Sequence, residues 1–549
     1  MYDARMQTLH ARTSRFVVVV VFAVVALAQS LASVAQAAET VLPFTGEVPA
    51  DGAYFDVAFE VPAGTVEIEI RHDDLSAVNI LDWGLIAPSG FRGYGGGNTE
   101  PAILNAAAAS RSYLPGAIEP GTWRVYVGKA KVEELPARYS IEVVLRDTIT
   151  LAAQPERAPY APVAALETNA RWYAGDFHVH TRESGDASPS LEEVAAFAEL
   201  RGLDFVMLSD HNTTSQLELI AATQAAHPAL LLVPGIEVTT YEGHAMALGG
   251  TQWIDPRIGR EGRTIDQIVA DVHAQDALFS INHPSFELGD LCIGCGWTAA
   301  LSTGTIDGVE LQTGALSITG IFYARNERFW EDLVGAGHHV AALGGSDDHR
   351  AGTGTGMFDS PIGGPTTMVF AQELSVAALM DGVRLGRTAV KLEGPDDPMI
   401  ALSSPELGAD TDTIIGDTAT FRVRVTGAEL GTMMRLVRDG AALPLTEVTS
   451  DPFEWETTLD ATGTGEDFIR AELLVGGRPR VVTSHLFLRG VSPPRPDGGT
   501  EPDAGTPPSA SDDGCSCRAS GAHRGTARAS LFGVVLAVMV AQRRRRMRR

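Results

Sequence analysis

The sequence predicts an α/β protein in which a central α/β domain is flanked by two β-sandwich domains. Residues 39–148 and 395–490 alternate apolar and polar side chains, which is typical of half-buried strands. Residues 170–393 alternate short apolar runs with helix-length amphipathic segments, which is typical of a parallel sheet or barrel covered by helices. A chain of 549 residues has room for about three domains.

Composition and net charge indicate a globular protein that does not bind nucleic acid. The chain is 44% hydrophobic and 20% charged, which is ordinary for a globular protein with sizeable cores. Its net charge is −27 and its pI is about 4.9. Such a charge repels phosphate backbones, so we expect no nucleic-acid binding. The same charge suits an exported protein that has to stay soluble.

The first 37 residues predict a secretory signal peptide. Arg5, Arg12 and Arg15 precede an apolar run at 16–28, and small residues follow up to Ala37, after which we expect cleavage. The alternative is an uncleaved anchor, but the apolar run is shorter than the ~20 residues of an ordinary span. Either reading predicts export.

The other end of the chain predicts a linker and an envelope-attachment tail. Residues 491–514 are rich in Pro, Gly and Asp and cannot bury a core. The tail, residues 515–549, begins within the motif "GCSC" (514–517) and continues with an apolar run at 531–541 and an arginine block. This order resembles the myxobacterial-type C-terminal sorting tail, which implies removal of the tail, modification at Cys515 or Cys517, and display at the cell surface. The alternative is a membrane anchor; both predict a protein of the cell surface or outer envelope, possibly released.

The two sandwiches are predicted from period-two segments separated by turn signals. They lie at 65–73, 122–130 and 137–147 in the first sandwich, and at 418–427, 453–460, 467–477 and 480–490 in the second, Ig-like one. Residues 149–169 are predicted to be a linker. Because neither sandwich concentrates chemically active residues, we interpret both as spacer or docking modules.

The central domain is predicted from alternating strands and helices. Ser188 and Pro189, followed by Glu192 and Glu193, predict a helix start, and Gly202 predicts its end. Further helices are expected at 264–276 and 322–337. Buried strands are expected at 203–211, 277–284, 305–313 and 338–349.

Potential metal ligands follow strand after strand in this domain. In the order of the chain they are His178, His180, Asp186, Asp210, His211, Glu237, His244, His283, Asp347 and His349. Six of the chain's 14 histidines belong to this set. The carboxyl ends of parallel barrel strands meet on one side, where active sites are built. Imidazoles and carboxylates that converge there without a cation would leave buried charge poorly compensated. The pattern therefore predicts a metal centre.

The motifs, in order, resemble those of a known family. "DFHVHT", "SDH", "GIEVTTYEGHAMALG", "NHP" and "GSDDH" resemble the polymerase-and-histidinol-phosphatase (PHP) family of metal-dependent phosphoesterases, and most of all its CehA/McbA branch. The resemblance implies a distorted (β/α)7 barrel with two or three metals. It implies a first metal at His178, His180, Glu237 and Asp347, and a second bridged by Glu237 and completed by His244 and His283. It implies a third at Asp186, His211 and His349.

The predicted function is an exported metal-dependent hydrolase, most simply a phosphoesterase acting on a small-molecule ester. Mixed nitrogen and oxygen ligands favour two or three Zn, Mn or Fe(II) ions, which make hydroxide available at neutral pH. We expect Asp210 to orient a ligand or the attacking water, and Arg182 and Arg350 to bind the substrate anion. Lys391 is a weaker candidate for that role, and Asp348 is expected in a loop. The alternatives are a carbamate or carboxyl-ester hydrolase, and a surface binding protein with structural metal.

Cys292 and Cys295 form an isolated CxxC motif. In an exported chain we expect a local disulfide that holds a loop. The alternatives are a zinc site, which needs two more ligands, and a redox pair, which needs a thioredoxin-like context.

Overall fold

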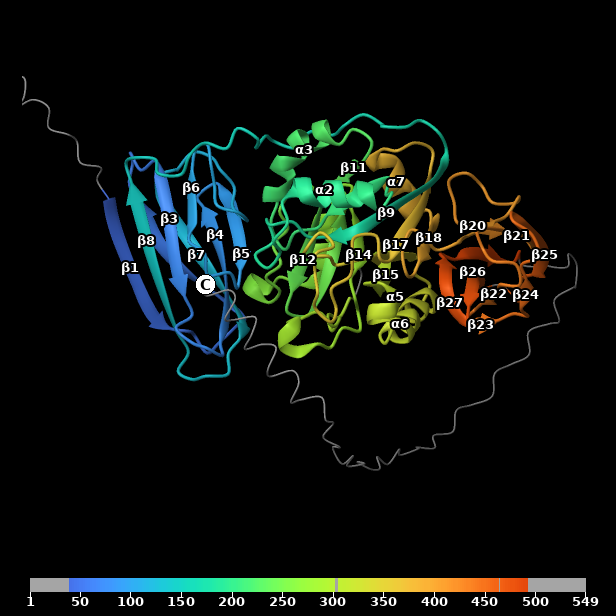
Figure 1. Cartoon of the computed structure of the whole chain (residues 1–549). Helices are drawn as coiled ribbons and strands as arrows, with labels where there is room; N and C mark the ends of the chain where they lie inside the picture. Colours follow the sequence, from blue (N-terminus) through green and yellow to red (C-terminus); the bar gives the residue numbers. More distant parts are fainter. Residues whose placement is uncertain (1–38, 302–304, 464, 492–549) are drawn as a thin grey trace, which may run out of the picture.

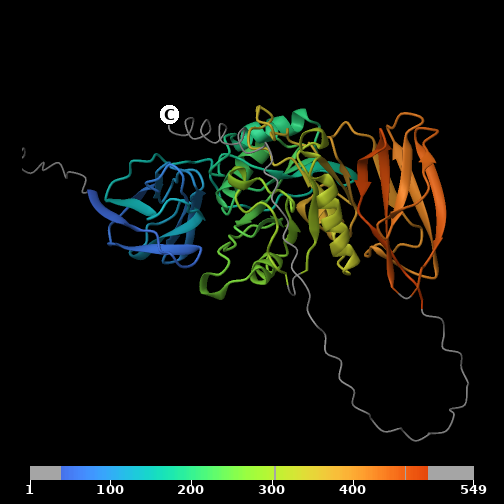
Figure 2. The same cartoon turned by 90° about the horizontal axis from the view of Figure 1, so that it is seen from below.

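The computed structural model describes residues 39–301, 305–463 and 465–491. Two sandwiches lie at opposite ends of a central α/β region, in both views of the molecule (Figures 1 and 2). The predicted signal peptide, the sorting tail and almost all of the linker before that tail lie outside the described residues. Within the described ranges, no helix is long and apolar enough to cross a membrane.

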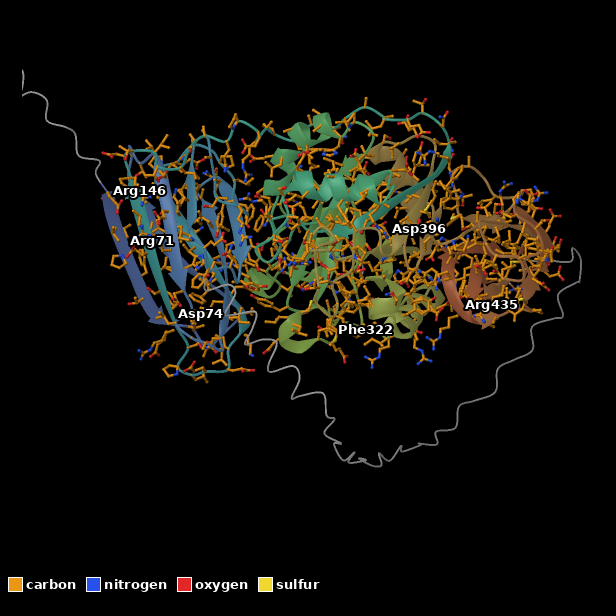
Figure 3. The ribbon with its side chains drawn as sticks, in the orientation of Figure 1. Arg71, Asp74, Arg146, Phe322, Asp396 and Arg435 are labelled. Atoms are coloured by element: carbon orange, nitrogen blue, oxygen red, sulfur yellow. A yellow bond between two sulfur atoms is a disulfide. The ribbon has the colours of Figure 1, made fainter. Side chains whose placement is uncertain are left out.

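The N-terminal region consists of two antiparallel four-stranded sheets. Their orders are β1-β8-β3-β6 and β2-β7-β4-β5. Inward side chains of both sheets, including Ile68 and Trp123, share one buried core. On the outside, Arg71 and Arg146 (labelled in Figure 3) come from neighbouring strands and both bind Glu69. The strands are β1 (Glu39–Glu47), β2 (Tyr54–Val61), β3 (Glu67–Asp73), β4 (Ile80–Ala87), β5 (Gly90–Gly96), β6 (Ala102–Asn105), β7 (Gly121–Lys131) and β8 (Arg138–Arg146).

The central region contains a mixture of parallel and antiparallel strands. Its strands are β9 (Arg171–Val179), β10 (Phe205–Leu208), β11 (Leu231–Val233), β12 (Gly235–Thr240), β13 (Gly243–Leu248), β14 (Leu278–Ile281), β15 (Gly308–Thr313), β16 (Ala341–Gly345), β17 (Thr366–Ala371) and β18 (Thr388–Lys391). The expected parallel pairing holds for β9–β10, β10–β11, β14–β15 and β15–β16. It is wrong for β12–β13, β13–β14, β9–β17 and β17–β18, which are antiparallel. The two-residue connection between β12 and β13 is too short for a parallel crossover.

Helices cover the central strands; those at Leu191–Leu200, Ile265–His273 and Tyr323–Gly335 were predicted from the sequence, and the other three were not. They are α2 (Leu191–Leu200), α3 (Ile220–Ala226), α4 (Ile265–His273), α5 (Leu316–Thr319), α6 (Tyr323–Gly335) and α7 (Val376–Arg384). The start of α2 lies two residues later than the helix signal at Ser188 suggested. Ser190 is its N-cap, and Ser190 and Glu193 form a reciprocal capping box. The order of strands and helices brings the loops that follow β9, β10 and β16 close to β12.

The C-terminal region is joined to the central one through a continuous sheet. β18 pairs with β27, so that one twelve-stranded sheet runs from β11 to the C-terminal strands. Val482 and Phe487 pack in the same core as Val390 and Leu392. The predicted boundary at 393–395 therefore interrupts neither the sheet nor the core. The strands are β19 (Met399–Ser403), β20 (Thr413–Ile415), β21 (Thr418–Thr426), β22 (Met433–Arg438), β23 (Ala441–Ala442), β24 (Thr446–Glu447), β25 (Phe453–Asp460), β26 (Glu466–Val475), β27 (Arg478–Thr483) and β28 (Leu486–Arg489).

Candidate metal centre

The predicted metal ligands converge on Glu237, a fully buried carboxylate in β12. His178 and His180 come from the end of β9, and His244 comes from β13. The others lie in loops that follow β9, β10, β14 and β16: Asp186, His211, His283, Asp347 and His349. All nine residues predicted as ligands are thus brought to one place. We call this group of nine the candidate centre.

Most distances between histidine nitrogens and the oxygens of Glu237 and Asp347 are similar. Glu237 Oε1 lies 3.4 Å from His178 Nε2, 3.4 Å from His244 Nδ1 and 3.3 Å from His283 Nε2. Glu237 Oε2 lies 3.4 Å from His180 Nε2. Asp347 Oδ1 lies 3.3 Å from His178 Nε2 and 3.2 Å from His180 Nε2. These separations exceed the ~2.7–2.9 Å of a charge-assisted hydrogen bond. His211 differs, because its Nδ1 lies 2.8 Å from Glu237 Oε2.

Hydrogen bonds on the far side of the rings fix where four histidines carry a proton. His178 Nδ1 lies 2.7 Å from the Glu310 carboxylate. His244 Nε2, His283 Nδ1 and His349 Nδ1 lie 3.3, 3.2 and 2.8 Å from backbone carbonyl oxygens. Because these oxygens only accept, each of these nitrogens donates. In a neutral ring the other nitrogen is then a lone pair, and in all four histidines that nitrogen faces a carboxylate oxygen.

A lone pair that faces a buried carboxylate is balanced only by a cation, which is either a second proton on the ring or a metal ion between the two atoms. Two ligand atoms bonded at ~2.1 Å to one tetrahedral ion lie roughly 3.4 Å apart, which matches the separations around Glu237. Within the described part of the chain, the Nε2 atoms of His178 and His180 and Oε2 of Glu237 are buried without a hydrogen-bond partner. Buried polar groups are normally satisfied. The residues present therefore fit divalent metal ions.

The candidate ligands fall into overlapping groups, each compact enough to hold an ion. The ligand atoms of a group lie within 4.8 Å of one another. The groups are His178, His180 and Glu237; His178, His283 and Asp347; Glu237, His244 and His283; His244 with the disulfide-bonded Cys292 and Cys295; and His180, His211 and His349. Asp186 borders the last group, with Oδ2 lying 3.3 Å from His349 Nε2 and 3.7 Å from His211 Nε2.

Charges in the candidate centre shift one another's ionisation. Burial disfavours the charged form of His178, but Glu310, Glu237 and Asp347 outweigh it and raise its pKa well above the usual value. Burial and two neighbouring histidines lower the pKa of His180 to about 3. Burial opposes ionisation of Glu237, yet the adjacent histidines hold its pKa well below the usual value. The carboxylate of Glu237 is thus ionised.

Two candidate ligands have backbone conformations that side chains rarely adopt. His283 has φ +28° and Asp347 has φ +55°. Such strain persists only where the surroundings impose it, and it is concentrated at functional sites. Next to them, Gly345 has no room for a side chain, because an added Cβ would lie 2.3 Å from the Cβ of His178.

Glu310, in β15, is a part of the site that the sequence analysis missed. It is buried; Oε1 lies 2.7 Å from His178 Nδ1, and Oε2 accepts from the backbone N–H of His283 at 3.1 Å and from Thr313 Oγ1 at 2.7 Å. Its only sequence signal was an acidic residue inside an apolar strand. Asn282 was also missed; its amide donates to Glu237 Oε1 at 2.9 Å.

Asp210 lies behind the candidate centre. Its Oδ1 accepts from the backbone N–H of Thr181 at 2.8 Å and of Ser184 at 2.9 Å. Ser184 Oγ in turn contacts His180 Nδ1 at 2.9 Å. Burial raises the pKa of Asp210 to about 7, although these bonds oppose the shift. Asp210 thus contacts His180 only through Ser184, and its role as a residue that orients a ligand stays a prediction. Asp348 binds backbone N–H groups of its own loop.

The predicted anion-binding cations occupy different places. The guanidinium of Arg350 donates to the carbonyl oxygens of Asp186, at 3.0 Å, and His349, at 2.7 Å, so it borders the candidate centre. Arg182 is exposed, and its backbone N–H bonds to the carbonyl oxygen of Pro189. Lys391 donates to the carbonyl oxygen of Pro395 at 2.9 Å, near the C-terminal region.

The N-terminal sandwich holds the loop that carries Asp186, which its interpretation as a spacer did not anticipate. Buried Ser112 donates through Oγ to the carbonyl oxygen of Glu183 at 2.6 Å and through its N–H to the Glu183 carboxylate at 3.0 Å. Arg111 donates to the carbonyl oxygens of Gly185 and Ala187. The sandwich thus helps to position one edge of the candidate centre.

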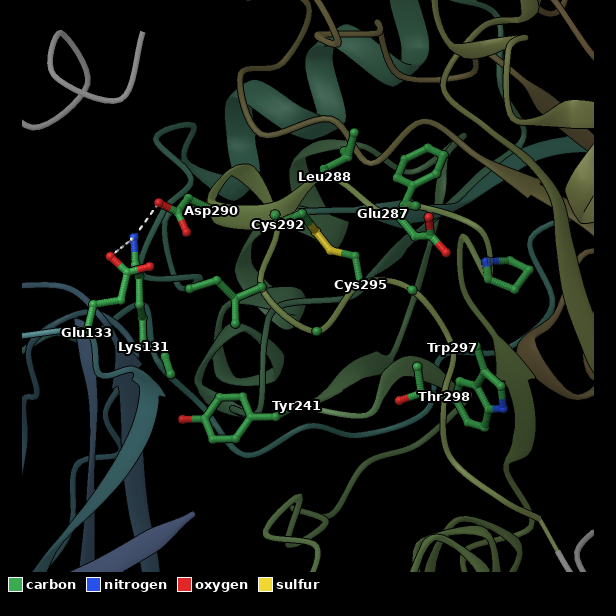
Figure 4. A pocket seen from close by; sticks show the side chains of 17 residues that line it. Lys131, Glu133, Tyr241, Glu287, Leu288, Asp290, Cys292, Cys295, Trp297 and Thr298 are labelled. Atoms are coloured by element: carbon green, nitrogen blue, oxygen red, sulfur yellow. Dashed lines mark hydrogen bonds and ion pairs between the residues drawn. A yellow bond between two sulfur atoms is a disulfide. The ribbon is translucent and has the colours of Figure 1, made fainter. Parts of the chain in front are cut away.

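Cys292 and Cys295 are disulfide-bonded, as predicted, with Cα atoms 5.5 Å apart. They line a cavity of about 390 Å³ between the N-terminal sandwich and the central region (Figure 4). Trp297 and Tyr241 form part of its wall. Lys131 of the sandwich pairs with Asp290 at its edge. A smaller cavity of about 120 Å³ lies beside His349.

Comparison with known proteins finds only solved structures of low similarity. No family model and no curated protein matches the chain. A two-domain protein from Bacteroides vulgatus, containing a predicted PHP-like metal-dependent phosphoesterase, is 16% identical, with a TM-score of 0.34; the match covers 61% of this chain and 100% of that one. An amidohydrolase from Chromobacterium violaceum is 17% identical, with a TM-score of 0.23, over 34% and 93% of the two chains. Similarity this low identifies no family.

Proposed function

We propose that this chain is a metal-dependent hydrolase that cleaves phosphoesters with two or three divalent ions. The observation that carries the proposal is the set of histidine ring nitrogens that face the carboxylates of Glu237 and Asp347 at 3.2–3.4 Å. A structural site normally closes four ligands around one ion. Nine converging side chains supply ligands for more than one, which favours catalysis over a purely structural metal.

Each residue has a proposed role. His178, His180, Glu237 and Asp347 hold a first ion; Glu237, His244 and His283 hold a second; and Asp186, His211 and His349 hold a third. The mixture of nitrogen and oxygen ligands favours Zn, Mn or Fe(II). When bound, such ions make hydroxide available at neutral pH and stabilise negative charge on the attacked ester.

The substrate approaches from the side of Asp186 in this proposal. The side chains of His178, His180 and Glu237 are 0% exposed, whereas that of Asp186 is 42% exposed and that of Asp347 is 26% exposed. Arg350 borders this open side and would attract a substrate anion. Asp210 acts behind His180, through Ser184, by keeping the ring in position.

Two further parts of the proposal concern fold and location. We infer that the central sheets form a distorted (β/α)7 barrel of the PHP type. Support comes from the bridges Val179–Asp348 and His211–Glu237, which connect the two sheets. We also propose that the protein is exported and attached to the envelope through its C-terminal tail. The Cys292–Cys295 disulfide supports export, because disulfides persist in oxidising compartments.

Hydrolysis by the purified, metal-loaded protein tests the function. The substrates are p-nitrophenyl phosphate, bis-p-nitrophenyl phosphate and 1-naphthyl N-methylcarbamate, and His180→Ala is the variant. We expect metal-dependent cleavage of a phosphoester that is lost in the variant. Cleavage of the carbamate alone would show attack at carbon. No turnover on any of the three, with one tightly held ion, would favour a binding protein.

A further inference from the structure

The disulfide loop, residues 292–296, lies against the histidines of the proposed second metal site. The carbonyl oxygen of Ile293 accepts from His244 Nε2 at 3.3 Å, and that of Cys295 accepts from His283 Nδ1 at 3.2 Å. The two carbonyl groups belong to the four-residue segment that the disulfide closes. Figure 4 shows this segment on the cavity wall, with the sulfur–sulfur bond across it.

Both hydrogen bonds act on the nitrogen that a metal would bind. With Nε2 of His244 and Nδ1 of His283 donating, the lone pairs are on His244 Nδ1 and His283 Nε2. These are the atoms that lie 3.4 and 3.3 Å from Glu237 Oε1. Such partners of metal-binding histidines fix the tautomer and the orientation of the ring. Here, both partners come from one short loop.

Few backbone hydrogen bonds hold this loop in place, although Cys295 is buried against Phe286 and Phe322. Among the described residues, the backbone N–H groups of 293–296 make no recorded backbone hydrogen bond. The nearest backbone bonds are at its edges, from Cys292 N to Gly289 O and from Trp297 N to Pro284 O. Gly294 has φ +77°, and an added Cβ would lie 2.5 Å from the carbonyl oxygen of Thr240. The disulfide is therefore the main covalent restraint on the two carbonyl groups.

We propose that the Cys292–Cys295 disulfide is a positioning element for the second metal ion. The proposal rests on the function proposed above. It means that occupancy of the second ion site depends on whether Cys292 and Cys295 are oxidised or reduced. The first ion does not depend on them, because His178 and His180 are oriented by Glu310 and Ser184 instead. Breaking the disulfide thus weakens the second site selectively.

The test compares metal binding by the full chain and by its Cys292→Ser/Cys295→Ser variant. Stepwise Zn²⁺ affinities are measured against a chromogenic chelator, and Co²⁺ absorption reports the ligand geometry. We expect the second ion to bind ~10–100-fold more weakly, with the first ion and its spectrum unchanged. The matched control, Lys131→Met, removes the ion pair on Asp290 but keeps the disulfide, and should bind both ions normally.

If the double-serine variant does not fold, chemical reduction of the wild-type disulfide provides the same test. The wild-type protein is treated with a phosphine and desalted; the sulfur–sulfur bond becomes two thiols while the phosphine is oxidised to its oxide, with water supplying the oxygen and the protons. We expect the same selective weakening. Unchanged or tighter binding of the second ion after reduction overturns the proposal; tighter binding would assign the thiols as ligands, since Cys295 Sγ lies 3.8 Å from His244 Nδ1. An oxidised wild type that binds no ion overturns both this inference and the proposed function.

Discussion

Replacing Glu310 by Gln tests whether a residue that touches no proposed ion controls metal affinity. The substitution keeps the shape of the side chain and removes its charge. The Glu310 carboxylate accepts from His178 Nδ1 at 2.7 Å and from the backbone N–H of His283 at 3.1 Å. A hydrogen bond to a charged group contributes ~1.5–3 kcal/mol, against ~0.5–1.5 kcal/mol for a neutral one.

The difference of about 1–1.5 kcal/mol corresponds to roughly tenfold weaker metal binding. The assay is competition between the apo protein and a chelator for Zn²⁺, with thermal unfolding measured in parallel. Glu472→Gln is the matched control: Glu472 is 0% exposed, against 3% for Glu310, and pairs with Arg470 and Arg435 in the C-terminal region. It should lower stability without changing metal affinity. If Glu310→Gln binds Zn²⁺ as tightly as the wild type, the tautomer argument is refuted.

Three further predictions concern packing, interdomain contact and pH. Gly345→Ala would place a methyl group 2.3 Å from the Cβ of His178. We expect the unfolding free energy to fall by ~1–3 kcal/mol and metal binding to weaken. The control Gly335→Ala, with open space around its Cβ, should change neither quantity. Ser112→Ala removes the donor to a buried carbonyl oxygen of the loop that carries Asp186; denaturation should show a cost of ~1–3 kcal/mol, and an unchanged midpoint would count against docking of the sandwich. Burial lowers the pKa of His72 to about 4, whereas the ordinary value in an unfolded chain is ~6.5. Between pH 6.5 and pH 4 the unfolded chain therefore binds a proton at His72 that the folded protein does not. Stability from His72 is therefore complete above pH 6.5 and falls as the solution is acidified, by at most about 3 kcal/mol; His72→Phe should lack this part of the acid dependence, and identical pH profiles would contradict it.

The sequence was most informative where histidines and carboxylates recur at the ends of predicted strands. His178, His180 and His283 each lie at or after the end of an apolar run; the assumption that such strand ends meet on one side of a barrel predicted that these residues would converge, and the structure brings them together. The same reasoning assumed parallel neighbours. His244 reaches the candidate centre from the antiparallel strand β13 instead, which the tight turn before it allows.

Contacts that are distant in sequence could not be predicted. Glu310 stands alone in an apolar strand, and only the fold places its carboxylate beside His178. Ser112 is an ordinary turn residue in the sequence, although it holds the loop next to the candidate centre. The pairing of β18 with β27 is likewise invisible to a period-two pattern, because alternation shows which side of a strand is buried but not which strand lies beside it.

Anomalous diffraction from crystals of the metal-loaded protein, recorded at the absorption edge of the bound metal, tests the central claim most directly. The account predicts at least two peaks: one bounded by His178, His180, Glu237 and Asp347, and one bounded by Glu237, His244 and His283. A well-ordered, metal-soaked crystal with no peak among these side chains, or with a single ion enclosed by four of them, would contradict a multinuclear catalytic centre.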